Sequence, residues 1–149
     1  MNDDYQQAVC YLDTNLFIYL IDTTGIQKHK KAQILCEHFF KNGNGRISVQ
    51  VMSEWRNAAI RKFSHWVDAA YRDQFLRQFI TWNPLLISSG IILEAEKLCQ
   101  KYAFSPYDSI HVQCALHMNC RFFLSEDMQD GLIVNDSLTL LNPFKNDSR

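Results

Sequence analysis

The chain has 149 residues, of which 47% are hydrophobic and 21% charged, and its formal net charge is −1. This length suits one globular domain, because such a chain buries roughly two thirds of its unfolded surface. The charge balance argues against a pure nucleic-acid-binding module, and the apolar runs are far shorter than the ~20 residues of a membrane span. We expect one domain over residues 1–149, with a polar extension at 1–8 and a polar tail at 145–149.

The cysteines, the histidines and the first residues predict a cytoplasmic protein without a zinc finger. The five cysteines form no C-x-x-C pair, and their odd number argues against a disulfide framework. The five histidines show no i,i+4 pair and no cysteine partner at zinc-finger spacing. The first residues, MNDDYQQ, are acidic and polar, the opposite of the basic start of a secretory signal.

Predicted strands and helices alternate along the chain. The apolar run at 8–12 is typical of a strand buried on both faces, and Asn42-Gly43-Asn44-Gly45 indicates a helix stop. Further strands are predicted at 46–49, 85–87 and 121–124, with a fifth at either 132–134 or 138–141. Helices are predicted at 16–21, 27–41, 50–63, 66–79 and 105–118, with another after the capping residue Ser88 or Ser89. This alternation indicates an α/β fold in which helices cover both faces of a mainly parallel sheet of four to five strands.

The fourth predicted helix carries an aromatic face whose role has two interpretations. Its spacing directs Ala70, Phe75 and Phe79 inward. The same face includes Trp66 and is followed by Trp82, so it forms either part of the core or an interface with another molecule. We favour the core.

Four acidic residues lie where a strand-to-helix switch delivers a carboxylate to one edge of the sheet. They are Asp13, Glu54, Asp108 and Asp127. Asp13 and Asp127 fall at or just beyond the carboxyl ends of predicted strands, which is where parallel α/β sheets bind ligands. Converging carboxylates repel one another unless protons or a cation neutralise them. An oxygen-only acidic pocket is what Mg²⁺ or Mn²⁺ favours, so the pattern predicts metal-assisted phosphoryl chemistry.

Several of these residues also have a purely structural interpretation. Asp13 can cap the helix that follows it, and Glu54 can interact with the dipole of its helix near the first turn. Asp108 lies three residues after Ser105 and resembles the acidic member of a capping box. Arg61 lies seven residues after Glu54 on the same helix face, so it can approach a substrate phosphate that Glu54 helps to address.

The segment around Asp127 offers more than one acidic ligand. Ser125 can cap a short helical turn while Asp127 points into the cleft. Asp130 lies three residues further along and is a spare ligand, so the choice between Asp127 and Asp130 stays open. Glu126 alternates in direction and is expected to face solvent.

In this order, the segments resemble the PIN-domain nucleases, and most closely the VapC-type ribonuclease toxins of bacterial toxin–antitoxin pairs. The resemblance covers about residues 9–144. The matching segments are YLDTNLFIY (11–19), SVQVMSEW (48–55), SPYDSIHVQCAL (105–116), FLSEDMQDG (123–131) and NPF (142–144). The resemblance implies a three-layer α/β/α PIN-like fold.

The resemblance also implies roles for individual residues. The acidic catalytic site would consist of Asp13, Glu54, Asp108 and Asp127. Of these, Asp13, Asp108 and Asp127 would bind Mg²⁺, with Mn²⁺ as a substitute, and Asp13 and Asp108 would be the most direct ligands. Thr14 and Asn15 would orient the ligands, and the supporting residues would also include Ser125 and Asp130.

The function implied is Mg²⁺-dependent hydrolysis of RNA phosphodiesters by a metal-activated water, with a cognate antitoxin protein as partner and a homodimer as the assembly. Two other functions compete with this one. A phosphorelay receiver domain also has a doubly wound sheet and an acidic Mg²⁺ pocket, but no lysine fits after the last strand near 132–141. A catalytically inactive PIN-like protein that binds RNA or a partner is disfavoured, because an unused pocket with four carboxylates is electrostatically strained.

Overall fold

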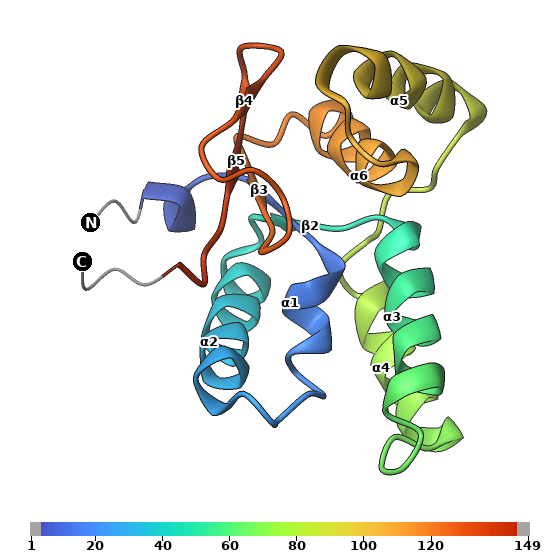
Figure 1. The fold of residues 1–149 in the computed structure, drawn as a ribbon. Helices are drawn as coiled ribbons and strands as arrows, with labels where there is room; N and C mark the ends of the chain where they lie inside the picture. The colour runs from blue at the N-terminus through green and yellow to red at the C-terminus, as the bar shows by residue number, and fades with distance from the viewer. Residues whose placement is uncertain (1–3, 146–149) are drawn as a thin grey trace.

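The computed structural model describes residues 4–145 and has a central sheet of five strands (Figure 1). The strand order is β2-β1-β3-β5-β4. The strands are β1 (Cys10–Leu12), β2 (Gly45–Arg46), β3 (Phe122–Leu124), β4 (Ile133–Val134) and β5 (Leu138–Leu141). The pairs β2–β1, β1–β3 and β3–β5 are parallel, and only the edge strand β4 runs antiparallel to its neighbour. The predicted mainly parallel sheet is therefore confirmed.

Six α-helices surround the sheet and complete the three-layer α/β/α fold. They are α1 (Thr14–Ile18), α2 (Ile26–Asn42), α3 (Val49–Lys62), α4 (Ala69–Ile80), α5 (Ser89–Tyr102) and α6 (Pro106–His117). In Figure 1, α5 and α6 lie together on one side of the strands, and α1 to α4 lie on the other. Along residues 4–145, no helix combines the length and apolarity needed to cross a membrane.

Local sequence signals fix several of the helix ends. Gly43 adopts φ +68° after α2, the left-handed conformation that a glycine accepts without strain. Ser105 caps α6 by accepting a hydrogen bond from the Asp108 amide, and Pro106 occupies the first turn. The helix predicted to begin at 66 begins instead at Ala69, because the Asp68 carboxylate caps it through the amide of Tyr71.

Two strand predictions needed correction. Residues 85–87 do not form a strand. Leu85 makes one isolated bridge to Ser48, and the pairing ends there, with the side chain of Leu86 exposed. The two alternatives for the fifth strand both form, as β4 and β5. Asn135 and Asp136 join them in a turn with φ +50° and +59°, which favours a tight hairpin.

The described part of the N-terminal extension packs against the body of the protein. Residues Asp4–Gln7 form a 3₁₀ helix, and Tyr5 is buried with its ring edge-on to Phe122. The Gln6 carbonyl accepts hydrogen bonds from His38 and Asn44. Residues 1–3 of the extension and 146–149 of the polar tail lie outside the described residues.

The aromatic face of α4 is only partly core. Phe79 is buried and Phe75 is half-buried, with the Phe75 ring stacked 4.1 Å from the buried ring of Trp55. Ala70 is exposed, contrary to the prediction, and Trp66 is 43% exposed. The helix therefore buries a narrower stripe than its spacing suggested.

Candidate active site

Asp13 lies at the carboxyl end of β1 and is held there by its neighbours on both sides. The parallel register pairs Leu12 with Leu124, so Asp13 and Ser125 leave adjacent strands at the same edge. The Ser125 hydroxyl donates a 2.7 Å hydrogen bond to Asp13 Oδ2. The Thr14 amide donates a 2.7 Å bond to Asp13 Oδ1, which makes Asp13 the cap of α1. The Asp13 side chain therefore caps α1 and also lies at the edge of the sheet where the site was predicted, so the two roles are compatible.

Glu54 reaches this edge from α3, which follows strand β2. The Thr14 hydroxyl donates to Glu54 Oε1 over 2.6 Å, and the Gln50 amide donates to Oε2 over 2.8 Å. Gln50 also donates to the Tyr107 carbonyl at the start of α6. These bonds tie α1, α3 and α6 together and leave the Glu54 carboxylate with one orientation.

His111 on α6 completes this group, and sequence reasoning did not identify it. Its Nε2 lies 2.8 Å from Glu54 Oε1 and 3.6 Å from Asp13 Oδ1. Its Nδ1 lies 2.7 Å from the hydroxyl of Tyr11, which in turn lies 2.8 Å from Ser48 Oγ. Only 1% of His111 is exposed. The i,i+3 spacing from Asp108 was a signal for it, because residues with that spacing share one helix face.

The three side chains change each other's proton affinity. Burial raises the pKa of the Asp13 carboxyl, although the nearby His111 opposes the change. Burial also acts to raise the pKa of Glu54, but the hydrogen bond and charge of His111 outweigh it and leave that pKa below its ordinary value. For His111, burial acts to lower the pKa, while the hydrogen bond to Glu54 and the charge of Asp13 bring it above its ordinary value. His111 thus acts as the counter-charge of the two carboxylates.

The donor atoms of Asp13, Glu54 and His111 all lie within 4.8 Å of one another, a spacing that could hold a metal ion. Asn15 lies beside them on α1, and its Oδ1 is buried without a hydrogen-bond partner among the described residues. An orphaned buried oxygen costs free energy that a cation or an ordered water would recover. The residues present therefore fit a divalent cation.

Comparison with protein families identifies the family of the chain. The model of the PIN domain matches residues 10–129, which includes Asp13, Glu54, His111 and the segment after β3. The chain belongs to the PIN domain family. PIN domains are in general metal-dependent nucleases, so the family agrees with an acidic site at this edge.

Solved structures support the same fold. A toxin–antitoxin complex from Klebsiella pneumoniae contains a chain that matches 92% of this chain, over 99% of its own length, with a TM-score of 0.68. The two sequences are 18% identical, so the likeness concerns the fold alone. A comparison with curated proteins gave no match.

The other acidic residues of the predicted PIN-domain site lie around this group rather than inside it. Asp127 is exposed, and its Oδ2 accepts a 3.1 Å hydrogen bond from Asn15, while its amide bonds to Ser125. Asp108 is half-buried, one helical turn before His111, and its charge contributes to the raised pKa of His111. The roles of Asp108 and Asp127 as metal ligands remain predictions.

Asp130 and Glu126 have structural partners of their own. Asp130 accepts a hydrogen bond from the Asn142 amide and forms an ion pair with Lys145 at 3.0 Å. These contacts fix the segment after β5. Glu126 was expected to face solvent but is half-buried, because it accepts hydrogen bonds from the hydroxyl of Tyr19 and from Lys28. The choice between Asp127 and Asp130 for the fourth acidic position stays a prediction.

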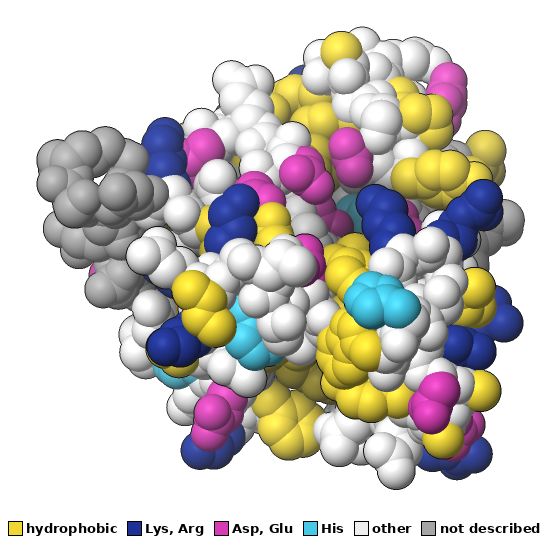
Figure 2. All heavy atoms as spheres, turned by 60° about the horizontal axis from the view of Figure 1, so that its bottom comes forward, with side chains coloured by type: hydrophobic (Ala, Val, Ile, Leu, Met, Phe, Trp, Pro, Cys, Tyr) yellow, Lys and Arg dark blue, Asp and Glu magenta, His cyan; other side chains and the backbone are white. Residues whose placement is uncertain are grey.

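One face of the molecule carries charges of both signs. Figure 2 shows acidic side chains gathered over the upper centre of one face, with Lys and Arg side chains on either side of them. Arg61 is exposed in the last turn of α3, two turns beyond Glu54. Cations beside a metal-binding cluster suit a substrate with a phosphate backbone.

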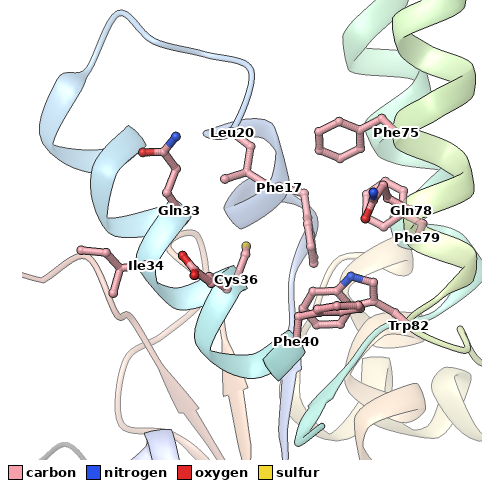
Figure 3. Close-up of a pocket in the computed structure, with 11 residues that line it drawn as sticks. Phe17, Leu20, Gln33, Ile34, Cys36, Phe40, Phe75, Gln78, Phe79 and Trp82 are labelled. Carbon is pink, nitrogen blue, oxygen red and sulfur yellow. The ribbon is translucent and has the colours of Figure 1, made fainter. Parts of the chain in front are cut away.

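A separate apolar groove lies away from the acidic group. It has a volume of about 650 Å³ and runs between α1, α2 and α4 (Figure 3). Its walls include Phe17, Phe40, Phe75 and Trp82, with the Phe40 and Trp82 rings 5.6 Å apart. Phe40 is 49% exposed although it lines the groove. Part of the aromatic lining of this groove is therefore exposed.

Proposed function

We propose that this PIN domain is a metal-dependent endoribonuclease and the toxin of a toxin–antitoxin pair. The observation that carries the proposal is the convergence of Asp13 and Glu54 at the carboxyl edge of β1, within hydrogen-bond reach of a shared network. Two buried or half-buried carboxylates in such proximity are costly for folding alone, and a cation relieves that cost. The family match supports the same chemistry.

In this proposal, Asp13 is the firmest ligand, with Asp108 and Asp127 completing the cation site. A bound Mg²⁺ supplies a more acidic water and stabilises charge on the attacking and leaving oxygens. Thr14, Gln50 and His111 fix the Glu54 carboxylate, so it can orient a water or accept its proton as a general base. Asp127 is the other candidate for that base.

The proposed substrate is RNA, and Arg61 is proposed to contact a substrate phosphate. The cations beside the acidic group support this choice, because they attract a phosphate backbone without making the whole molecule basic. The net charge of −1 predicts weak non-specific binding, so we expect the metal site and the local cations to carry most of the affinity.

The proposed partner is an antitoxin protein that inserts an amphipathic segment into the apolar groove. Two observations support this. The groove exposes aromatic side chains, and their exposure to water does not stabilise a folded monomer. A structural neighbour with this fold is part of a toxin–antitoxin complex. We further propose a homodimer and a cytoplasmic location.

The test compares the wild type with Asp13→Asn on a broad pool of RNA, with sequencing of the RNA ends. Asparagine keeps the cap of α1, so we expect a folded variant that has lost Mg²⁺-dependent cleavage. Asp73→Asn is the control, because Asp73 forms an exposed ion pair with Arg77 on the surface of α4. Undiminished cleavage by folded Asp13→Asn would falsify the assignment. No cleavage by the wild type with either Mg²⁺ or Mn²⁺ would favour an inactive PIN-like binding protein.

A further inference from the structure

We infer that Nε2 of His111 is itself a ligand of the cation, so the site is a mixed nitrogen–oxygen site rather than an oxygen-only one. The inference rests on the metal dependence in the proposed function but not on RNA as its substrate. It predicts that the site takes a transition-metal ion such as Mn²⁺ in preference to Mg²⁺.

The distances between the donor atoms carry this inference. In an octahedral site with metal–ligand bonds of about 2.1 Å, neighbouring ligand atoms lie about 3 Å apart. Nε2 of His111 lies 2.8 Å from Glu54 Oε1 and 3.6 Å from Asp13 Oδ1, values that bracket that separation. Because all three donor atoms lie within 4.8 Å of one another, Nε2 of His111 and Oδ1 of Asp13 can share one ion while Glu54 stays beside them as the proposed base.

The orientation of the imidazole is fixed from behind. Its ring meets the rings of Tyr11 and Phe123 edge-on, and these two rings stack on each other. Nδ1 lies against the Tyr11 hydroxyl, which lies against Ser48. Metal-binding histidines commonly donate their other N–H to such a partner, and this arrangement leaves the lone pair of Nε2 for the metal. With the proton on Nδ1, the imidazole donates to the Tyr11 hydroxyl and that hydroxyl donates to Ser48 Oγ, so each of these groups has a hydrogen-bond partner.

A nitrogen ligand changes which ion the site prefers. Mg²⁺ strongly favours oxygen ligands and loses its waters reluctantly, whereas imidazole raises the affinity for first-row transition metals. The alternative role for His111 is to remain a hydrogen-bond donor to Glu54 while the cation binds oxygen atoms only. The two roles differ in whether a nitrogen atom is bonded to the metal.

Pulsed electron paramagnetic resonance of bound Mn²⁺ tests this directly. Mn²⁺ is added to the full-length protein, made once with natural histidine and once with ¹⁵N-labelled histidine. We expect a directly coordinated ¹⁴N coupling that becomes a ¹⁵N coupling on labelling. His111→Gln should remove the coupling and weaken Mn²⁺ binding by on the order of tenfold or more, while changing Mg²⁺ binding much less.

His117→Gln is the matched control, because His117 is an exposed histidine in the last turn of the same helix. It should leave the coupling and the Mn²⁺ affinity unchanged. If His111→Gln fails to fold, His111 is identified in the wild type by ¹⁵N NMR, through its contacts with Tyr11 and Phe123. Its Nε2 should then lose its proton and shift when diamagnetic Zn²⁺ is titrated in, whereas a hydrogen-bond donor to Glu54 would keep that proton.

Three results would overturn the inference: Mn²⁺ bound without nitrogen coupling, a coupling that survives in folded His111→Gln, or no Mn²⁺ binding at all. The outcome is separable from the proposed function. Nitrogen coupling without RNA cleavage leaves the metal site standing and removes the ribonuclease. RNA cleavage with Mg²⁺ and no nitrogen coupling supports the ribonuclease and rules out His111 as a metal ligand.

Discussion

At the scale of single residues, the acidic group depends on one buried imidazole. Asp13 and Glu54 place two carboxylates beside Nε2 of His111, and the hydroxyls of Thr14 and Ser125 complete their hydrogen bonds. Without a metal, a protonated His111 is what keeps the carboxylates from repelling each other. A cation that binds here replaces that proton, so metal binding and the charge of His111 compete.

The raised pKa of His111 predicts how the metal-free protein responds to pH. Because the folded pKa lies above the ordinary value of 6.5, the stabilisation is fully present below pH 6.5 and is lost as the pH rises through the folded pKa. We expect the Tm in the presence of a chelator to fall as the pH rises above 6.5 through the folded pKa of His111. In Glu54→Gln this fall should be shallower, because His111 loses its closest negative partner.

Thermal unfolding followed by circular dichroism over this pH range measures the effect. Glu94→Gln is the control, since Glu94 forms an exposed ion pair with Lys97 and should retain the wild-type slope. Parallel slopes for wild type and Glu54→Gln would show that His111 does not titrate against Glu54.

Sequence patterns identified the carboxylates but not the residue that holds them. Asp13 and Glu54 follow predicted strands, so the geometry of a parallel sheet was enough to bring them to one edge. For His111, the sequence offers only its i,i+3 spacing from Asp108, because the contacts that place it in the group, with Tyr11 and Glu54, span 100 and 57 residues. Contacts over such separations come from packing, which a single sequence does not display.

At the scale of elements, β2 is a two-residue edge strand that positions α3 and hence Glu54. It allows little space: a Cβ at Gly45 would lie 2.6 Å from the Trp82 ring and 2.8 Å from Cβ of Phe39. Neither atom is the far end of a flexible side chain, and the Trp82 ring is itself packed edge-on against Phe17. The close approach of backbone and aromatic ring therefore requires glycine at this position.

Gly45→Ala should consequently destabilise the protein by about 1–3 kcal/mol, the usual cost of overpacking a tight site. The comparison variant is Gly25→Ala at the start of α2, where nothing lies within 4 Å of the added Cβ and the backbone is free of positive φ. Urea unfolding at equilibrium gives both free energies. Equal stability of the two variants would mean that Trp82 moves aside at no cost.

The ends of helices were predictable where nearby capping residues set them. The extents of strands were not, because they depend on pairing with distant segments. Ser105 with Pro106 and the Gly43 region gave correct helix ends, because caps act within a few residues. The run at 85–87 has the composition of a strand, yet it finds a neighbour for only one residue. The segments 132–134 and 138–141 were predicted as alternatives for one strand, but both form strands. They pair with each other as β4 and β5, because a strand is stable only when it is paired with a neighbour.

At the scale of the whole molecule, the acidic edge and the apolar groove are separate surfaces. None of the residues that line the groove belongs to the group of Asp13, Glu54 and His111. Helix α1 connects them, since Thr14 at its start bonds to Glu54 and Phe17 in its next turn forms a wall of the groove. A partner that fills the groove therefore touches the helix that Asp13 caps.

This separation predicts variants that escape the proposed antitoxin and keep the proposed nuclease activity. Ile34 and Phe40 line the groove from α2 and are 68% and 49% exposed, so Ile34→Lys and Phe40→Lys change the surface with little effect on the core. Each should weaken binding of the antitoxin by about 30-fold, the effect of losing a 2 kcal/mol anchor. Cleavage of RNA should remain at the wild-type level. Co-expression with the product of the adjacent gene, scored by growth and by titration of the purified proteins, measures both. Leu86→Lys is the control, because it alters an apolar residue outside the groove that is 76% exposed. An equal loss of binding in that variant, or full neutralisation of the two groove variants, would place the antitoxin elsewhere.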